Sequence, residues 1–339
     1  MQHLDGPQGP CCTNKVTAFP SSNSVAMTWD LDIAFSFARA VGREEFLKGT
    51  TIVLGPAVNI ARVPWGGRLF EYVGEEPFLA AAMGVRLVQG IQSNNISACI
   101  KHYVANSQEY NRFTMSSNIA KRVLHEVYYP AFKAAVDAGV GSIMCSYNRI
   151  NGTYSCENNS TLVHDLKGRF GFRGWVRSDG GATLSPLYAN GGLDQEMPAV
   201  QFFGPALQKA VEAGEVPLAR VQNMITRILT SFYALSMLDH PSPYNMSNDA
   251  TSPAHAKLAR HIAEQSAVLL KNEKGLLPLN TTGRYTIAVF GDNNTVTGGG
   301  SGDVQTPYVV TPFQGIATFI EKAGLDIKVR LFPQNYLCI

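Results

Sequence analysis

The sequence of 339 residues lacks both an excess of charge of one sign and any long apolar stretch. Its 28 basic and 26 acidic side chains leave a net charge of +2, which gives no argument for binding to nucleic acid or to a membrane surface. No apolar run approaches the roughly 20 residues that a membrane-spanning helix needs. The first residues show neither the charged nor the apolar segment of a signal peptide. A hydrophobic content of 45% with 16% charged residues indicates a packed globular protein.

Several motifs that carry a known chemistry are also missing. The six cysteines form no Cys-X-X-Cys pair, so we expect no zinc site. The chain has no Gly-X-Ser-X-Gly nucleophile turn and no His-Glu-X-X-His metal helix. The glycine-rich stretch 298–302 lacks the Gly-Lys-Ser/Thr ending of a phosphate-binding loop. We therefore expect neither a metal nor a nucleotide cofactor.

Apolar runs typical of buried strands alternate with helical spacing over the first 238 residues, after a loop-rich stretch at 1–30. This alternation indicates parallel strands joined by helical crossovers. It predicts an N-terminal (β/α)8 TIM-like barrel whose first elements are missing. A doubly wound open sheet is the alternative, although no strand is followed by Gly-X-Gly-X-X-Gly. The expected strands are 50–56, 97–103, 141–147 and 174–179, and the expected helices are 29–49, 76–92, 119–138, 162–170, 205–213 and 218–238.

A proline- and serine-rich break at residues 239–244 predicts a domain boundary. We expect the barrel domain at 1–238, a linker at 239–258, and the start of an α/β sandwich domain at 259–339. About 80 residues are few for a self-sufficient parallel α/β domain, so we expect a fragment. The elements expected after the break are helices at 255–271 and 312–323 and strands at 285–291 and 326–331.

Polar side chains follow three of the expected strands. They are Lys101 with His102, Tyr147, and Asp179. Active sites of such barrels lie where strands end, and a rim of polar groups suits a polyhydroxylated ligand. Neighbours on a strand point to opposite sides, so Lys101 and His102 both reach a ligand only if a bulge or loop begins there. The alternatives are that Asp179 caps the turn made by Gly180 and that His102 is a core histidine with its own partners.

The expected loop at 62–71 holds two arginines, a tryptophan and a glutamate. Arg68 offers several fixed donors, and Trp65 offers an apolar face to a sugar ring. The alternative is that Arg68 and Glu71 form a structural ion pair.

Cysteines and glycosylation sequons point towards a secreted protein. Cys145 and Cys156 lie 11 residues apart across a loop and could close a disulfide. Seven Asn-X-Ser/Thr sequons add to this indication. They begin at Asn95, Asn151, Asn158, Asn159, Asn245, Asn280 and Asn293.

A series of short motifs, taken in order, resembles glycoside hydrolase family 3, most closely its fungal-type secreted β-glucosidases. The match runs nearly end to end, from Asp5 to Pro312. The motifs are Leu4-Asp5-Gly6-Pro7, Thr17-Ala18-Phe19-Pro20, Gly55-Pro56-Ala57-Val58-Asn59-Ile60-Ala61-Arg62, Gly67-Arg68-Leu69-Phe70-Glu71, Lys101-His102-Tyr103-Val104-Ala105-Asn106, Met144-Cys145-Ser146-Tyr147-Asn148, Gly174-Trp175-Val176-Arg177-Ser178-Asp179, Gly192-Leu193-Asp194-Gln195-Glu196-Met197-Pro198 and Ala267-Val268-Leu269-Leu270-Lys271-Asn272.

The resemblance implies a barrel followed by an α/β sandwich, with the active site between them. It implies hydrolysis of terminal non-reducing β-D-glucosyl residues with retention of configuration, without cofactor or metal, on a β-glucoside or oligosaccharide substrate. Asp179 matches the nucleophile, and Cys145 and Cys156 match a disulfide of the secreted relatives. The positions that match substrate-binding residues are Asp5, Arg68, Lys101, His102, Met144, Tyr147 and, in the glycine loop, Ser301.

The chain departs from this family pattern at two places that matter for activity. Gly180 stands where the family usually has a tryptophan directly after the nucleophile. The acid/base glutamate of the family lies beyond the last residue, so none is assigned. The alternative function is therefore a truncated or degenerate homologue that binds sugar without turnover. The β-N-acetylhexosaminidase branch fits less well, because its Gly-His-Gly loop is replaced by residues 103–106.

Overall fold

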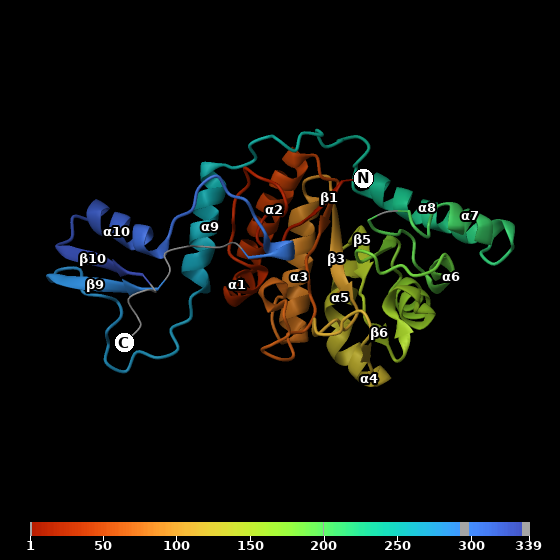
Figure 1. Ribbon diagram of the computed structural model, residues 1–339, viewed down its shortest axis with the longest axis horizontal. Coiled ribbons are helices and arrows are strands. Elements are labelled where there is room, and N and C mark those ends of the chain that lie inside the picture. The colour runs from red at the N-terminus through yellow and green to blue at the C-terminus, as the bar shows by residue number, and fades with distance from the viewer. Residues whose placement is uncertain (1, 199, 292–297, 334–339) are drawn as a thin grey trace.

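The computed structural model describes residues 2–198, 200–291 and 298–333, which form two α/β units of unequal size (Figure 1). The smaller unit, at the left of the view, holds β9 (Tyr285–Phe290), α10 (Pro312–Lys322) and β10 (Ile327–Phe332). Its two strands are parallel neighbours. The larger unit holds a parallel sheet with helices packed around it. Among the described residues, no helix is long and apolar enough to cross a membrane.

The sheet of the larger unit has five strands in the order β1-β2-β3-β5-β8, each parallel to its neighbour. Every residue of the last four is buried, as expected for apolar strands that are covered on both faces. This arrangement confirms the expected parallel α/β class and is consistent with a barrel. The strands are β1 (His3–Asp5), β2 (Ile52–Leu54), β3 (Ser97–Tyr103), β5 (Ser142–Cys145) and β8 (Trp175–Ser178).

A side chain on one outer strand of this sheet reaches a side chain on the other outer strand. Arg177 on β8 is buried, and its Nη2 lies 3.4 Å from Nδ1 of His3 on β1. Beyond β8 the hydrogen-bonding pattern continues, because Ser178 N donates to the carbonyl of Gln195. The sheet therefore curls until its first and last strands come within reach of one side chain.

The helices begin and end at residues that suit helix termini. Asp30 caps α2 by accepting from Ile33 N, and Gly49 ends it at a φ of 90°, a conformation that favours a residue without Cβ. Thr311 and Gln314 form a capping box at the start of α10. The remaining elements are α1 (Ser22–Met27), α2 (Leu31–Lys48), α3 (Pro77–Gln92), α4 (Lys121–Val123), α5 (Pro130–Asp137), α6 (Tyr188–Gly191), α7 (Pro205–Glu212), α8 (Leu218–Ala234), α9 (Pro253–Ser266), the π-helical segments η2 (Leu124–Tyr128) and η4 (Ser160–Arg169), and the 3-10 turns η1 (Leu69–Glu71), η3 (Ser155–Glu157) and η5 (Gly300–Gly302).

The stretch 1–30 is loop-rich, as expected, although it contains β1 and α1, which are too short to show a periodic pattern. Two expectations about local structure were wrong. The helix expected at 119–138 is broken into α4, η2 and α5 at Pro130, which has no N–H to donate to the preceding turn. The helix expected at 255–271 ends at Ser266. A small sheet was also missed, made of the two-residue strands β4 (Ser116–Ser117), β6 (Arg149–Ile150) and β7 (Thr153–Tyr154).

Two disulfides are present among the described residues. Cys145 and Cys156 are bonded, as the family resemblance implied, and the bond ties the end of β5 to η3. The adjacent Cys11 and Cys12 form the second. Cys99 is free and buried in β3. Cys338 and the sequon asparagine Asn293 lie outside the described residues.

A buried carboxylate joins three elements of the larger unit. Asp194 is 3% exposed, and its Oδ2 lies 2.7 Å from Lys167 Nζ on η4 and accepts from Val176 N on β8 at 2.8 Å. Its Oδ1 accepts from Arg220 Nη2 on α8 at 2.5 Å. Burial lowers the pKa of Lys167 to about 7, although Asp194 opposes this shift. Asp194 therefore holds η4 and α8 against the last strand of the sheet.

We expect Asp194→Asn to lower the free energy of unfolding by about 3–5 kcal/mol, because removing one partner of a buried ion pair leaves the others uncompensated. Urea unfolding followed by circular dichroism measures this. The matched control is Asp137→Asn, which removes an exposed pair with Lys133 and should cost less than about 1 kcal/mol. Equal costs for the two variants would contradict the assigned role of Asp194.

Candidate active site

Three polar residues expected at strand ends, Lys101, His102 and Asp179, lie at one edge of the sheet together with Asp5, for which no strand was expected. Asp5 is the last residue of β1, Lys101 and His102 lie in the second half of β3, and Asp179 directly follows β8. Because the strands are parallel, their carboxyl ends meet at the same edge. Two groups of contacting side chains lie at this edge: His102 with Asp179 forms a pair, and Asp5, Lys101, Glu71 and Arg68 form a cluster.

Lys101 lies at the centre of this cluster. Its side chain is 2% exposed, and its Nζ contacts Oδ1 of Asp5 and lies 3.5 Å from Oε2 of Glu71. Burial alone would lower the pKa of Lys101, but the carboxylates of Asp5 and Glu71 outweigh it and raise the pKa above its ordinary value. Lys101 is therefore a buried ammonium held between two carboxylates.

Glu71 connects Lys101 on the sheet to Arg68 in the neighbouring loop. Its side chain is fully buried in η1, and its Oε1 accepts from Arg68 Nε. Arg68 Nη1 lies 4.0 Å from Oε1 of Glu109. The ion pair of Arg68 with Glu71 that the sequence left open is thus present. It is also part of the cluster, because Glu71 contacts Lys101.

The glycine-rich segment reaches the same cluster from the far part of the chain. Ser301 in η5 donates from Oγ to Oε2 of Glu71 at 3.3 Å. Gly302 packs so closely that a Cβ would lie 2.7 Å from Oε1 of Gln8 and 2.9 Å from the ring of Phe70. A residue with a side chain would not fit there without movement. The close packing fixes Ser301 beside the charged edge.

His102 is buried next to Asp179. Its Nε2 lies 3.7 Å from Oδ2 of Asp179, and its backbone N donates to Oδ1 of Asn59 at 2.7 Å. Burial, with the charges of Arg68 and Lys101, lowers the pKa of His102 well below its ordinary value. The imidazole is therefore neutral near pH 7, and its contact with Asp179 is not an ion pair.

A register shift explains how both Lys101 and His102 reach the site. Regular alternation would send the two side chains to opposite faces. The pairing of β3 with β5 is regular through Ile100 and shifts before Tyr103. This irregularity is the bulge that was expected if both side chains are to reach one ligand.

Asp179 is a buried carboxylate with an available oxygen. The residue is 9% exposed, and Oδ1 accepts from Gly180 N at 2.7 Å. Its buried Oδ2 has no hydrogen-bond partner among the residues that the structure describes. Burial raises the pKa of Asp179 above its ordinary value, while the Gly180 N–H, Lys101 and Arg68 oppose this rise. Such an oxygen is suited to accept a hydrogen bond from a ligand or to attack an electrophilic carbon.

Tyr147 forms a wall beside Asp179. Its hydroxyl donates to the carbonyl of Gly180 at 2.9 Å, and the guanidinium of Arg112 lies 4.4 Å from the centre of its ring. Phe113 packs edge-on against the same ring at 4.7 Å. Gly180 leaves open space, because the only atom that a Cβ would approach among the described residues is the Tyr147 hydroxyl, at 3.4 Å.

Met144 is placed differently from the other expected site residues. It is 1% exposed and packs in an apolar cluster with Cys99, Trp175 and Met197. Its expected role in lining the site stays a prediction.

Sequence reasoning did not assign Asn59, Glu71 or Glu109 to the site. Asn59 holds His102 through two backbone hydrogen bonds, the second from its Nδ2 to the His102 carbonyl at 2.9 Å. All three are polar residues outside the expected strands and helices, and Asn59 and Glu71 lie within motifs already singled out. Only the packing shows that Glu71 contacts a lysine 30 positions later in the chain.

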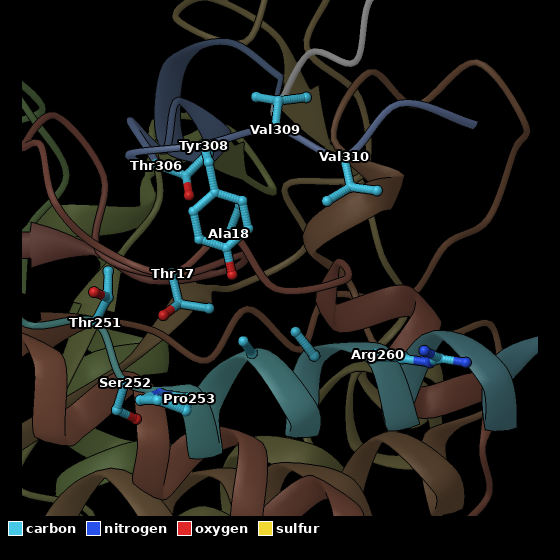
Figure 2. A pocket seen from close by; sticks show the side chains of 12 residues that line it. Thr17, Ala18, Thr251, Ser252, Pro253, Arg260, Thr306, Tyr308, Val309 and Val310 are labelled. Atoms are coloured by element: carbon cyan, nitrogen blue, oxygen red, sulfur yellow. The ribbon is translucent and has the colours of Figure 1, made fainter. Parts of the chain in front are cut away.

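A groove of about 700 Å³ lies elsewhere, between α9 and the segment that leads to α10 (Figure 2). Thr17, Ser252 and Tyr308 line it together with apolar residues such as Val309 and Val310. None of the charged residues of the sheet edge lines this groove. The groove and the cluster of reactive side chains therefore lie in different places. We assign the candidate active site to the sheet edge, because the reactive side chains lie there.

Comparisons with known families agree with the two-unit organisation. Residues 1–231 match the glycosyl hydrolase family 3 N-terminal domain. Residues 267–338 match the glycosyl hydrolase family 3 C-terminal domain.

Similar proteins and structures cover nearly all of this chain. The chain is 38% identical to probable beta-glucosidase L of Emericella nidulans over 95% of its own length and 49% of that protein. The crystal structure of beta-D-glucoside glucohydrolase from Trichoderma reesei has a TM-score of 0.91 and 35% identity, covering 97% of this chain and 50% of that one. DesR, a beta-glucosidase from Streptomyces venezuelae crystallised with D-glucose, has a TM-score of 0.88 and 33% identity, covering 98% of this chain and 44% of that one. The chain thus spans about half the length of the relatives it matches.

We expect the pKa of the His102 imidazole to lie well below its ordinary value, because burial and neighbouring cations disfavour its charged form. In NMR spectra of ¹⁵N-histidine-labelled protein, assigned with His102→Gln, its signals should move at a much lower pH in the folded protein than in the urea-unfolded chain, where a histidine titrates at about 6.5. A folded-state titration at or above the pH of the unfolded-state titration would contradict the assignment.

Proposed function

Because the chain belongs to glycosyl hydrolase family 3, we propose that it hydrolyses terminal non-reducing β-D-glucosyl residues, with retention of configuration and Asp179 as the nucleophile. The observation that carries the proposal is the buried Asp179 carboxylate, whose Oδ2 has no protein partner among the described residues and faces a neutral imidazole. The substrate would be a β-glucoside or a short oligosaccharide, as in the breakdown of cellulose. The similarity to probable beta-glucosidase L and to a beta-D-glucoside glucohydrolase supports this substrate class.

In this proposal, an oxygen of Asp179 attacks the anomeric carbon while the bond from that carbon to the leaving oxygen breaks. The product is a glycosyl ester on Asp179 with inverted configuration. Water then attacks the same carbon and gives up a proton, and Asp179 leaves with its electron pair, which restores the original configuration. The proton released by water balances the one that the departed oxygen takes up to form the free alcohol. Lys101 and Arg68 support the ionised carboxylate by opposing the rise that burial causes in the pKa of Asp179.

The remaining residues of the charged edge would bind the glucosyl unit. Asp5, Lys101 and Arg68 present charged groups to sugar hydroxyls, for which charge-assisted hydrogen bonds are strong. His102 and Tyr147 flank Asp179, and Ser301 would close the site from the second unit. Met144 would contribute an apolar surface beneath the sugar.

We further propose that the protein is secreted and that it carries N-linked glycans. The Cys145–Cys156 disulfide and the sequons support an oxidising, extracellular location. The proposed domains are the barrel at 1–238, the linker at 239–258 and the partial sandwich at 259–339.

The nucleophile is tested with 2,4-dinitrophenyl β-D-glucoside, whose leaving group departs without a proton from an acid. We expect Asp179→Asn to lower the rate by on the order of 10³-fold or more, because the covalent step is lost. The matched control is Asp165→Asn, which changes a buried aspartate that bonds Tyr129 outside the cluster and should retain activity. A 2-deoxy-2-fluoro-glucoside should label the peptide that contains Asp179. Equal rates for wild type and Asp179→Asn, or a label on another peptide, would refute the assignment of Asp179. Sugar binding with no hydrolysis by the wild type would instead favour a homologue that binds sugar without turnover.

The role of Lys101 is tested by the pH dependence of kcat/KM. Asp179 must be ionised to attack, so activity falls as the pH drops through its pKa. Lys101→Met removes a cation that lowers this pKa, so the acidic limb should move to higher pH. Lys133→Met, an exposed lysine on α5, should leave the limb in place. An acidic limb of Lys101→Met that stays put or moves to lower pH would show that Lys101 does not act on Asp179.

A further inference from the structure

A second layer of side chains lies beneath the candidate site. Residues two positions apart on a strand point to the same face. Asp5, Lys101 and Asp179 of the site each follow, by two positions, a residue that belongs to this lower layer. The residues of the lower layer are His3 on β1, Cys99 on β3 and Arg177 on β8.

Arg177 is the member of the lower layer that lies beneath Asp179. The pairing of β8 with β5 is regular from Trp175 to Ser178. One further bond, from Asp179 N to the carbonyl of Cys145 at 3.2 Å, extends this pairing past the end of β8. Because the pairing is unbroken, the period of two is kept, and the side chains of Arg177 and Asp179 point to the same face.

The neighbours of Arg177 in the lower layer are neutral. Its Nη2 lies 3.4 Å from Nδ1 of His3, and this Nδ1 accepts because a guanidinium can only donate. Burial, followed by the charge of Arg177, lowers the pKa of His3 to about 4, although Asp5 opposes the shift. Burial raises the pKa of the Cys99 thiol. Arg177 is therefore the charged member of the lower layer near pH 7.

The guanidinium of Arg177 is buried without contact to a carboxylate. The residue is 1% exposed, and its Nε and Nη1 have no hydrogen-bond partner among the described residues. Its Nη2 contacts His3 and Met197, neither of which is acidic. Met197 and Cys99 pack in an apolar cluster with Trp175. In such surroundings a charge acts more strongly on other charges than it would in water.

The site above Arg177 contains the carboxylates that act on it. Burial lowers the pKa of Arg177, whereas Cys99, Asp5 and Asp179 oppose this fall. The guanidinium stays protonated near pH 7, because its ordinary pKa lies so far above neutrality. The attraction is mutual, since a cation held beneath a carboxylate favours the ionised form of that carboxylate.

We propose that Arg177 is a positioning residue, a fixed cation beneath Asp179 that helps to keep this carboxylate ionised and able to attack. The inference deepens the proposed function, because it rests on Asp179 as the nucleophile. It adds a cation on β8 to the one that Lys101 supplies from β3.

Other titratable groups also face Asp179, so the test must separate Arg177 from them. Lys101, Arg68 and a hydrogen bond from Tyr147 oppose the rise that burial causes in the pKa of Asp179. Arg177 acts from the layer below, so we expect a smaller effect from it than from Lys101. The remaining groups near Asp179 are His102, Tyr72 and Cys99.

The test compares the pH dependence of kcat/KM for 2,4-dinitrophenyl β-D-glucoside between wild type and Arg177→Met, which removes the charge and keeps an unbranched apolar chain. Asp179 attacks only when it is ionised, so activity falls as the pH drops through its pKa. Loss of the cation raises this pKa, and the acidic limb should therefore move to higher pH, by less than in Lys101→Met. The loss of rate relative to wild type should be greatest at low pH and shrink as the pH rises.

Two further variants separate charge from shape and from burial. Arg177→Lys keeps a cation and should move the limb less than Arg177→Met does. Arg227→Met is the matched control, because Arg227 on α8 is half-buried and donates to the carbonyls of Phe172 and Gly174 at the other end of β8. It should leave the acidic limb in place.

A second measurement does not depend on hydrolysis. In protein labelled with ¹³C at the aspartate carboxyl carbons, the Asp179 signal, assigned with Asp179→Asn, should titrate at higher pH in Arg177→Met than in wild type. If the wild type hydrolyses no glucoside, the proposed function fails, and this titration still tests Arg177. If Arg177→Met does not fold, the neutral variant Arg177→Gln takes its place.

An Asp179 titration that stays in place or moves to lower pH in the neutral variant would overturn the inference. Equal movement in Arg177→Lys or in Arg227→Met would do the same. A loss of activity that is uniform across the pH range, with an unchanged Asp179 titration, would show that Arg177 serves only the structure of the sheet.

Discussion

The candidate site depends on the pairing of the buried Lys101 ammonium with two carboxylates. It lies between the carboxylates of Asp5 and Glu71, and Glu71 in turn contacts Arg68 and Ser301. Each charge is removed from water, so each requires its partners to remain tolerable in the interior. One requirement for charge compensation thereby ties two strands, a loop and the glycine-rich segment of the second unit to the same edge of the sheet.

The neighbourhood of this cation also determines the state of the two groups nearest to the proposed reaction. Burial raises the pKa of Asp179 and lowers that of His102, so each is biased towards its neutral form. The cations oppose that bias at the carboxylate and reinforce it at the imidazole. The same nearby cations therefore favour an ionised Asp179 and a neutral His102. The arrangement needs a rigid sheet edge, which the Asp194 network supports from the other side of β8.

Much of the fold could be predicted from local patterns, because buried parallel strands are apolar throughout and helices show their periodicity. Strand β3 and helix α3 were predicted closely for this reason. Strand β1 could not be, since three residues carry no period and pair only because β2 lies alongside. A break at Pro130 could be predicted from the proline itself. The π-helical form of the preceding segment could not be predicted from the residue types.

The sequence by itself determined which chemical groups are available at the candidate site. Lys101, His102 and Asp179 each stand in or directly after an apolar run, and parallel strands end together, whereas Asp5 was found only through its family motif. Only the tertiary structure decided how those groups are paired. Glu71 is polar in a loop, and nothing local indicates that it contacts Lys101 and Ser301, which are 30 and 230 positions away. Electrostatic and hydrogen-bond partners are set by distances in space, so the local sequence pattern does not predict them.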